Sequence, residues 1–166
     1  MRFYALALVS VATLAACAKG DKPADSAVAA DTSIAAPAPS PAPAGGTMAM
    51  APITGTTHEV KMVGDDKGYR FEPANITVKA GDGVKFTMIS GGPHNVAFDA
   101  ATVADDVEAQ LDANMGTDKS GMLSSGMKMN ANESVTVSFA NVKAGTYPFH
   151  CTPHLAMNMK GVVTVQ

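Results

Sequence analysis

The sequence predicts a single all-β domain, folded as a sandwich. Seven short segments rich in β-branched and aromatic residues alternate between apolar and polar positions, as strands buried on one face do. Turn sequences such as "KAGDG" and "VKAGT" separate them, and no internal repeat divides the chain, so one sandwich accounts for the pattern. In chain order the predicted strands are 58–63, 76–79, 84–90, 94–98, 134–139, 146–151 and 161–166.

Two features interrupt the strand pattern. Val103, Val107 and Leu111 recur four residues apart, which favours a short amphipathic helix over residues 100–114. The Gly-, Ser- and Met-rich sequence that follows is typical of a loop, so we expect one helical or irregular excursion at about residues 100–130. Pro148 removes a backbone donor from the predicted strand 146–151, which predicts an edge position or a bulge.

Residues 1–17 resemble an export signal. Arg2 precedes an apolar run that is too short to span a hydrocarbon core about 30 Å thick at about 1.5 Å per residue. The sequence "LAAC" ending at Cys17 resembles a bacterial lipobox, which implies cleavage before Cys17 and lipid attachment to it; an ordinary secretory signal is the alternative. We therefore expect an exported protein, lipid-anchored to a bacterial membrane and facing the periplasm or the cell surface.

Residues 18–55 have the composition of a tether. Ala, Pro, Ser, Gly and Thr dominate, as in "APAPSPAPAGG", and without large apolar residues such a segment cannot offset the entropy lost on ordering. The sequence therefore predicts a disordered link between the lipid anchor and a folded domain at residues 56–166.

Charge and cysteine usage limit the possible partners. The net charge is −3, whereas a nucleic-acid-binding protein needs a basic face, so we expect no nucleic-acid partner. A lipidated Cys17 cannot form a disulfide, which leaves Cys151 alone in an oxidising compartment. A bound metal would protect such a thiol.

The sequence "HCTPHLAMNM" at residues 150–159 concentrates soft and borderline metal donors. Strand alternation places Cys151 on the core-facing row of strand 146–151, and His94 on that of strand 94–98. His150 must then point outward. A loop of this length can fold back so that His154 and Met159 face the same point as Cys151.

These donors predict copper. Two imidazoles and a thiolate with a weak axial thioether suit a copper ion that cycles between two oxidation states. Zinc prefers four strong donors in a tetrahedron, and a thioether is a poor fourth. Each residue alone would be read as an ordinary core or loop residue, and it is their conjunction that indicates one-electron transfer by a single copper ion.

Residues 56–166 resemble the cupredoxin family of type 1 blue copper proteins, plastocyanins and pseudoazurins in particular. "GGPHNVAFD" resembles the segment carrying the family's first histidine ligand, and "YPFHCTPHLAMNMKGVVTV" resembles the closing strands and ligand loop. "YRFEPANITVKAGDGVKFT" is similar to the preceding core. The resemblance implies a Greek-key β-sandwich and an electron carrier, not an enzyme.

The resemblance also implies the residues of the site. Met157 competes for the axial position, but the spacing from the second histidine favours Met159. Asn95 resembles the residue that ties the first ligand strand to the cysteine loop, which would hold the geometry through the redox cycle. Matched residue by residue, the copper ligands are His94, Cys151, His154 and Met159.

Two other functions compete with electron transfer. In copper nitrite reductases the residue at the position of His150 binds a catalytic copper, but Asp99 stands where those enzymes have another histidine ligand. His58 lies in the wrong region, and we expect no second cupredoxin domain. A periplasmic copper carrier would use methionines that otherwise read as linker and loop residues: Met48, Met50, Met115, Met122, Met127 and Met129.

The excursion carries a cluster of acidic residues, Asp105, Asp106, Glu108 and Asp112. A solvated helix face explains them, and a docking patch for a basic partner, weakened by salt, is the alternative. The expected partners are redox proteins such as a c-type cytochrome or a membrane electron-transfer complex, and we expect a monomer.

Overall fold

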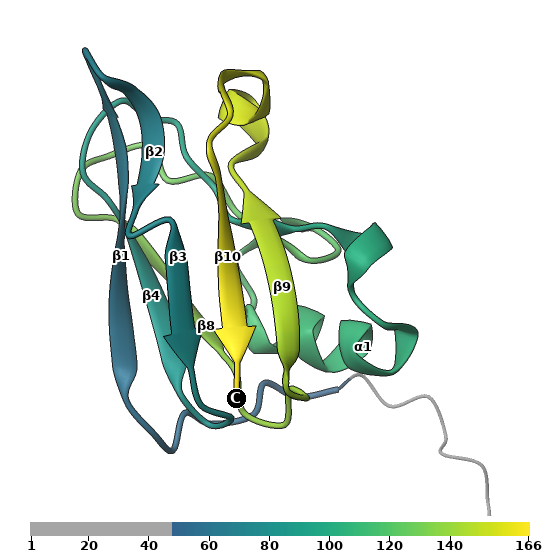
Figure 1. Cartoon of the computed structure of the whole chain (residues 1–166). Helices are drawn as coiled ribbons and strands as arrows, with labels where there is room; N and C mark the ends of the chain where they lie inside the picture. The colour runs from purple at the N-terminus through teal and green to yellow at the C-terminus, as the bar shows by residue number, and fades with distance from the viewer. Residues whose placement is uncertain (1–47) are drawn as a thin grey trace, which may run out of the picture. The chain divides into compact units, whose positions relative to one another are not determined.

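The computed structural model describes residues 48–166 (Figure 1). The predicted signal sequence, the predicted lipidation site Cys17 and most of the predicted tether lie outside the described residues. No helix within the described part of the chain is both long and apolar enough to cross a membrane.

Two sheets form the domain, and they confirm the predicted β-sandwich. The first is ordered β2-β1-β4-β8, and its only parallel pair is β1 with β4. The second is ordered β3-β10-β9-β5-β7-β6, with β10 and β3 parallel. The strands are β1 Thr57–Asp65, β2 Gly68–Glu72, β3 Asn75–Val78, β4 Gly83–Met88, β5 Ala97–Phe98, β6 Lys119–Gly121, β7 Ser124–Ser125, β8 Ser134–Ser138, β9 Gly145–His150 and β10 Lys160–Val165.

An aromatic cluster joins the two sheets. Phe149 of β9 packs edge-on against Phe71 of β2, with ring centroids 4.7 Å apart, and against Phe86 of β4 at 5.2 Å. Such pairs contribute about 0.5–1.5 kcal/mol beyond the burial of their area. Because Phe149 lies two residues before Cys151, this core fixes the strand that carries the cysteine.

The segment 94–98 departs from the predicted strand. Only Ala97 and Phe98 form a strand, and His94 makes an isolated bridge to Lys128. The expected alternation of buried and exposed residues is wrong, because Asn95 and Ala97 are also buried. Strand β7 lies beside β5 in the same sheet, with Ala97 paired to Ser124, and the side chain of Asn95 bonds to Ser124 and Thr152 in place of facing solvent.

The excursion contains the predicted helix. Helix α1, Asp105–Asn114, buries Val107 and Leu111 against the core, and Val103 is buried just before it. A short 3-10 helix, η1 (Ala100–Thr102), precedes α1. The side chain of Asn114 accepts a bond from Ala51 N–H at 2.9 Å and donates to the Ala140 carbonyl at 2.8 Å. These domain contacts begin before residue 56, the predicted start of the domain.

Pro148 lies in an inner strand, so the predicted edge position or bulge is wrong. Strand β9 lies between β10 and β5, and its register with β10 is unbroken. The Pro148 carbonyl accepts a bond from Asp99 N–H at 3.2 Å. In an antiparallel pair the N–H and C=O of one residue point to the same side, so the missing donor would have faced Asp99. Pro148 therefore lies where the pairing of β5 with β9 ends, just beyond Phe98. It does not break a longer run of pairing between these strands.

Asp82 closes the turn between β3 and β4. Its carboxylate accepts bonds from Lys79 N–H at 3.0 Å, from the His58 ring at 2.9 Å and from Thr56 N–H at 2.8 Å. These three donors hold the pKa of Asp82 at about 2, below its ordinary value of 3.8.

We predict that Asp82→Asn lowers the melting temperature at neutral pH, because an amide nitrogen cannot accept these bonds. A depressed carboxyl pKa stabilises the fold above the unfolded-state value and loses that contribution as the pH falls towards about 2. The difference in melting temperature between wild type and Asp82→Asn should therefore shrink as the pH falls from neutral towards about 2. Melting curves across that range test this, and a difference independent of pH would contradict it.

Candidate metal centre

The loop between β9 and β10 brings three of the predicted donors together. Cys151 directly follows β9, and its backbone N–H donates to the Met159 carbonyl at 3.0 Å. A 3-10 segment, η2 (Thr152–Met157), lies between them, and Asn158, at φ 63°, turns the chain into β10. Figure 1 shows this loop at the end of the sandwich opposite the C-terminus.

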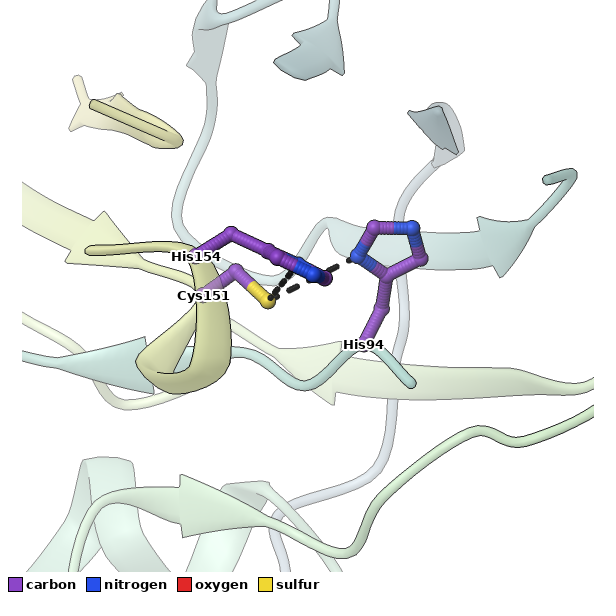
Figure 2. Close-up of side chains that lie close together, drawn as sticks. All are labelled: His94, Cys151 and His154. Atoms are coloured by element: carbon purple, nitrogen blue, oxygen red, sulfur yellow. Dashed lines mark hydrogen bonds between the residues drawn. The ribbon is translucent and has the colours of Figure 1, made fainter. Parts of the chain in front are cut away.

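His94, Cys151 and His154 form one compact group of donors. The Cys151 sulfur lies 3.6 Å from Nδ1 of His94 and 3.4 Å from Nδ1 of His154. The three donor atoms all lie within 4.8 Å of one another, and all three residues are buried. In Figure 2 each of the two imidazole rings turns a nitrogen, Nδ1, towards the Cys151 sulfur. Among residues 48–166, no other group of three or more His, Cys, Asp or Glu side chains meets this geometry.

Hydrogen bonding fixes the tautomer of His94. Its Nε2 lies 2.8 Å from the Ser90 carbonyl, which can only accept, so Nε2 carries the proton and Nδ1 presents a lone pair. Burial lowers the pKa of His94, and burial together with the nearby His94 lowers the pKa of His154. Both rings are therefore neutral at pH 7 and ready to bind a metal.

The Cys151 thiol is protonated until a metal displaces its proton. Burial raises the pKa of this thiol, and the backbone N–H groups of Asn95 and His154 oppose that shift in part. The same two donors would stabilise the thiolate once it forms.

Met159 is better placed than Met157 for the axial position. Met159 is fully buried and lies across from Cys151, whereas Met157 is 52% exposed. This agrees with the spacing argument, and the axial role of Met159 stays a prediction.

Asn95 makes the tie between the two ligand segments that the sequence suggested. Its Oδ1 accepts a bond from Thr152 N–H at 2.7 Å, and its Nδ2 donates to the Thr152 hydroxyl at 3.2 Å. Nδ2 also lies 3.1 Å from the Ser124 hydroxyl. One buried amide thus joins the segment of His94, the loop of Cys151 and strand β7.

Sequence reasoning missed two residues that contact the imidazoles, Ser90 and Tyr69. Ser90 supplies the carbonyl bound by His94, a backbone role without a sequence signature. Tyr69 stacks on His154 with ring centroids 3.8 Å apart and an interplanar angle of 15°. Alternation in β2 offered a signal, because Tyr69 shares the inner face with the core residue Phe71.

The remaining histidines do not join the group. His150 is half-buried and lines an open depression on the outer face with Asp99, Leu155 and Lys160. His58 bonds to Asp82 in the turn region described above. The second metal site of a nitrite reductase is therefore not assembled within residues 48–166.

The donor set fits copper. Two neutral imidazoles and one thiolate-forming cysteine, with the buried Met159 at the end of the same loop, do not supply the four strong ligands that a structural zinc site needs. Because the donors come from two segments joined by Asn95 and rest on a packed sandwich, the protein holds them close together.

Known proteins resemble this domain in sequence. A family model described as copper binding proteins, plastocyanin/azurin family, matches residues 58–166. The plastocyanin of Daucus carota is 38% identical over 107 residues, which cover 64% of this chain and 98% of that protein. The chloroplastic plastocyanin of Physcomitrium patens is 42% identical over 106 residues, which cover 64% of this chain and 56% of that protein.

A solved structure gives the same result. The oxidized form of plastocyanin from Dryopteris crassirhizoma aligns with 66% of this chain and all of its own, at 33% identity and a TM-score of 0.50. The resemblance to this family is thereby confirmed, while the assignment of the four ligands stays a prediction.

We predict that binding of Cu⁺ to the metal-free protein at pH 7–8 releases about one proton, from Cys151, because both histidines are already neutral. The apparent affinity should rise about tenfold per pH unit in this range. Competition with a Cu⁺ chelator at several pH values measures this. Cys151→Ser should remove the dependence, and a wild-type affinity that does not change with pH would contradict the assignment.

Proposed function

The chain belongs to the plastocyanin/azurin family of copper-binding proteins, and from that premise we propose that it carries single electrons between exported redox proteins. It is a type 1 copper electron-transfer protein, and its plastocyanin relatives argue for a carrier, not a catalyst. The observation that carries the proposal is the convergence of three buried donors from two segments that are distant in the sequence. We assign as the copper ligands His94, Cys151, His154 and Met159.

Copper, when bound, supplies the one-electron couple. The protein supplies a dry, fixed set of donors. His94 and Cys151 are fully buried and His154 is nearly so, and Asn95 and Ser90 hold the segments that carry them. Donors that stay in place when the copper changes its oxidation state keep the reorganisation energy of the site small. Rapid electron transfer requires a small reorganisation energy.

The η2 loop offers a contact surface for partners. Leu155 and Met157 follow His154 in this loop and are 41% and 52% exposed. An apolar surface beside a ligand would let a partner approach the copper closely. We propose that a c-type cytochrome or a membrane electron-transfer complex docks here.

The acidic cluster on α1 supports docking less well. Asp106 pairs with Lys143, and Asp112 pairs with Lys119 at 2.5 Å, so half of the cluster is already neutralised. Helix α1 also lies towards the opposite end of the sandwich from the η2 loop (Figure 1).

The copper-carrier alternative is less well supported. A carrier must exchange its metal readily, whereas the Cys151 and Met159 side chains are fully buried. The exposed methionines of the described residues are spread over several segments of the chain: Met48, Met50, Met122, Met127, Met129 and Met157.

We also propose that the protein is exported and lipid-anchored. The support is the "LAAC" sequence ending at Cys17 and the Ala- and Pro-rich segment after it. Such a tether would let a monomeric electron carrier move above the membrane surface between its partners.

The copper spectrum tests the function. We predict that the protein loaded with Cu²⁺ is intensely blue, that reduction bleaches it, and that Cys151→Ser abolishes the colour, because the band arises from the thiolate–copper bond. Visible absorption and electron paramagnetic resonance measure this. Met159→Leu should change the spectrum and raise the reduction potential, while the matched Met157→Leu should change neither; the reverse pattern would reassign the axial ligand. A colourless wild-type adduct would refute the function.

Docking at the η2 loop makes a separate prediction. Leu155→Lys should slow electron transfer to a c-type cytochrome about fivefold or more, equivalent to about 1 kcal/mol of lost transition-state contact. Stopped-flow kinetics at low and high salt measure this. The double variant Asp105→Asn/Glu108→Gln is the comparison, and if it slows the reaction more than Leu155→Lys does, and only at low salt, the acidic cluster is the docking site instead.

A further inference from the structure

The end of the β1–β2 hairpin touches both imidazoles of the copper site. Tyr69 stacks on His154 with centroids 3.8 Å apart and lies edge-on to His94 at 6.1 Å. Ser90 holds His94 through its carbonyl. Both contacts depend on Gly64 of β1, and we refer to Gly64, Tyr69 and Ser90 as the imidazole brace.

Gly64 makes room for the Tyr69 ring. The two residues are directly paired across the hairpin. A Cβ atom at position 64 would lie 2.7 Å from Tyr69 Cε1 and 2.9 Å from the Gly91 backbone, distances that real Cβ atoms do not tolerate. The bare backbone of Gly64 therefore lets the tyrosine ring lie flat enough to reach His154.

Gly64 is also bonded to the residue that holds His94. Its N–H donates to the Ser90 carbonyl at 2.9 Å, and its carbonyl accepts from the Ser90 hydroxyl at 3.0 Å. The Ser90 carbonyl is the same atom that accepts from His94 Nε2 at 2.8 Å. One backbone position thus connects the contacts to the two imidazoles.

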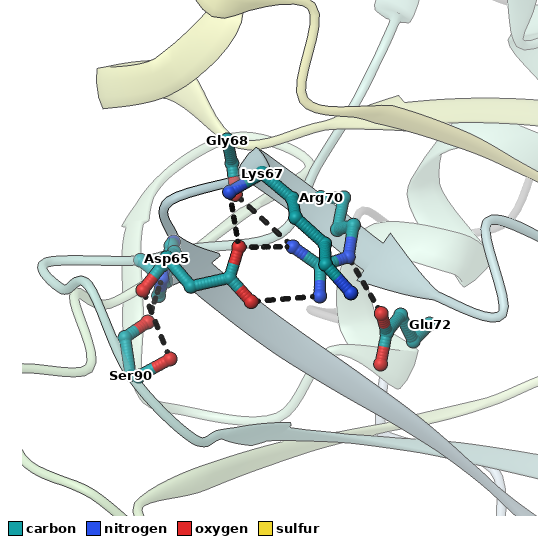
Figure 3. Close-up of polar contacts among 8 residues, drawn as sticks. Asp65, Lys67, Gly68, Arg70, Glu72 and Ser90 are labelled. Carbon is teal, nitrogen blue, oxygen red and sulfur yellow. Dashed lines mark hydrogen bonds and ion pairs between the residues drawn. The ribbon is translucent and has the colours of Figure 1, made fainter.

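Ion pairs close the hairpin beside the brace (Figure 3). Arg70 donates to both carboxylate oxygens of Asp65, at 2.7 and 2.9 Å, and to Glu72 at 2.5 Å. Asp65 also accepts from Lys67 N–H at 2.9 Å. A bidentate pair restricts geometry more than a single contact does, and Arg70 directly follows Tyr69, so these pairs limit the motion of the strand that carries the ring.

We propose that Tyr69 is a positioning residue which, through the imidazole brace, keeps His154 beside the copper in the reduced state. The inference rests on the proposed function, because it takes His154 as a copper ligand. An aromatic ring stacked on a ligand opposes the rotation by which that ligand would leave, and the hairpin supplies the fixed support. The hydroxyl of Tyr69 has no part in this role.

The test compares Tyr69→Leu, Tyr69→Phe and Phe71→Leu in the full chain. Phe71 lies on the same face of β2 but contacts the core phenylalanines and neither imidazole, so Phe71→Leu is the matched control for lost stability. Each protein is loaded with copper and reduced. The release of Cu⁺ to a chelator is then followed at concentrations where the rate no longer depends on the chelator.

We expect Tyr69→Leu to release Cu⁺ about two- to tenfold faster than wild type, the range that an aromatic pair supports. Tyr69→Phe should match wild type, and so should Phe71→Leu at a temperature where it is fully folded. Equal release by Tyr69→Leu and wild type would overturn the proposal. So would fast release by Tyr69→Phe, which would implicate the hydroxyl, or by Phe71→Leu, which would indicate a general loss of stability.

The same samples separate this inference from the function it rests on. If the wild-type Cu²⁺ protein has the blue thiolate band and Tyr69→Leu releases Cu⁺ at the wild-type rate, the function stands and the brace is refuted. If the wild-type protein has no such band, the proposed function fails first, and the brace fails with it.

Discussion

A backbone hydrogen bond from Cys151 to Met159, at 3.0 Å, closes the loop on which the copper site depends. It makes the residues on either side of η2 neighbours in space, so that a cysteine at the end of one strand and a methionine before the next lie together. His154 lies within the closed loop, where its Nδ1 faces the Cys151 sulfur. The fourth donor comes from a distant segment, and Asn95 bonds that segment to the same loop.

The sandwich converts this loop into a rigid site. The Phe149 cluster fixes the strand that leads to Cys151, and Pro148 ends its pairing with β5 one residue past Phe98. From the other sheet, Tyr69 of the β1–β2 hairpin stacks on His154, and Ser90, just after β4, holds His94 through its carbonyl. Supports from both sheets therefore meet at one end of the fold, which is the arrangement an electron carrier needs if its donors are to stay in place.

The sequence predicted the parts of this site that depend on local spacing. The interval from Cys151 to His154, the place of His94 in "GGPHNVAFD" and the four-residue period in helix α1 were enough to predict the donor group and the helix. Alternation failed at residues 94–98, because Asn95 faces Ser124 and Thr152 and is buried by the bonds to them, where a half-exposed strand would face solvent. Tyr69 and Ser90 were missed because their roles arise from hairpin pairing and a backbone carbonyl, and neither leaves a pattern in nearby residues.

We infer that the protein holds copper in one geometry through both oxidation states. X-ray absorption at the copper edge, recorded on the oxidised and reduced protein in solution, measures this directly. We predict two nitrogen ligands and one short sulfur ligand in both states, with nearly unchanged distances. Loss of a nitrogen ligand on reduction, or a site with several thioethers and no short sulfur distance, would contradict the account and favour a copper carrier.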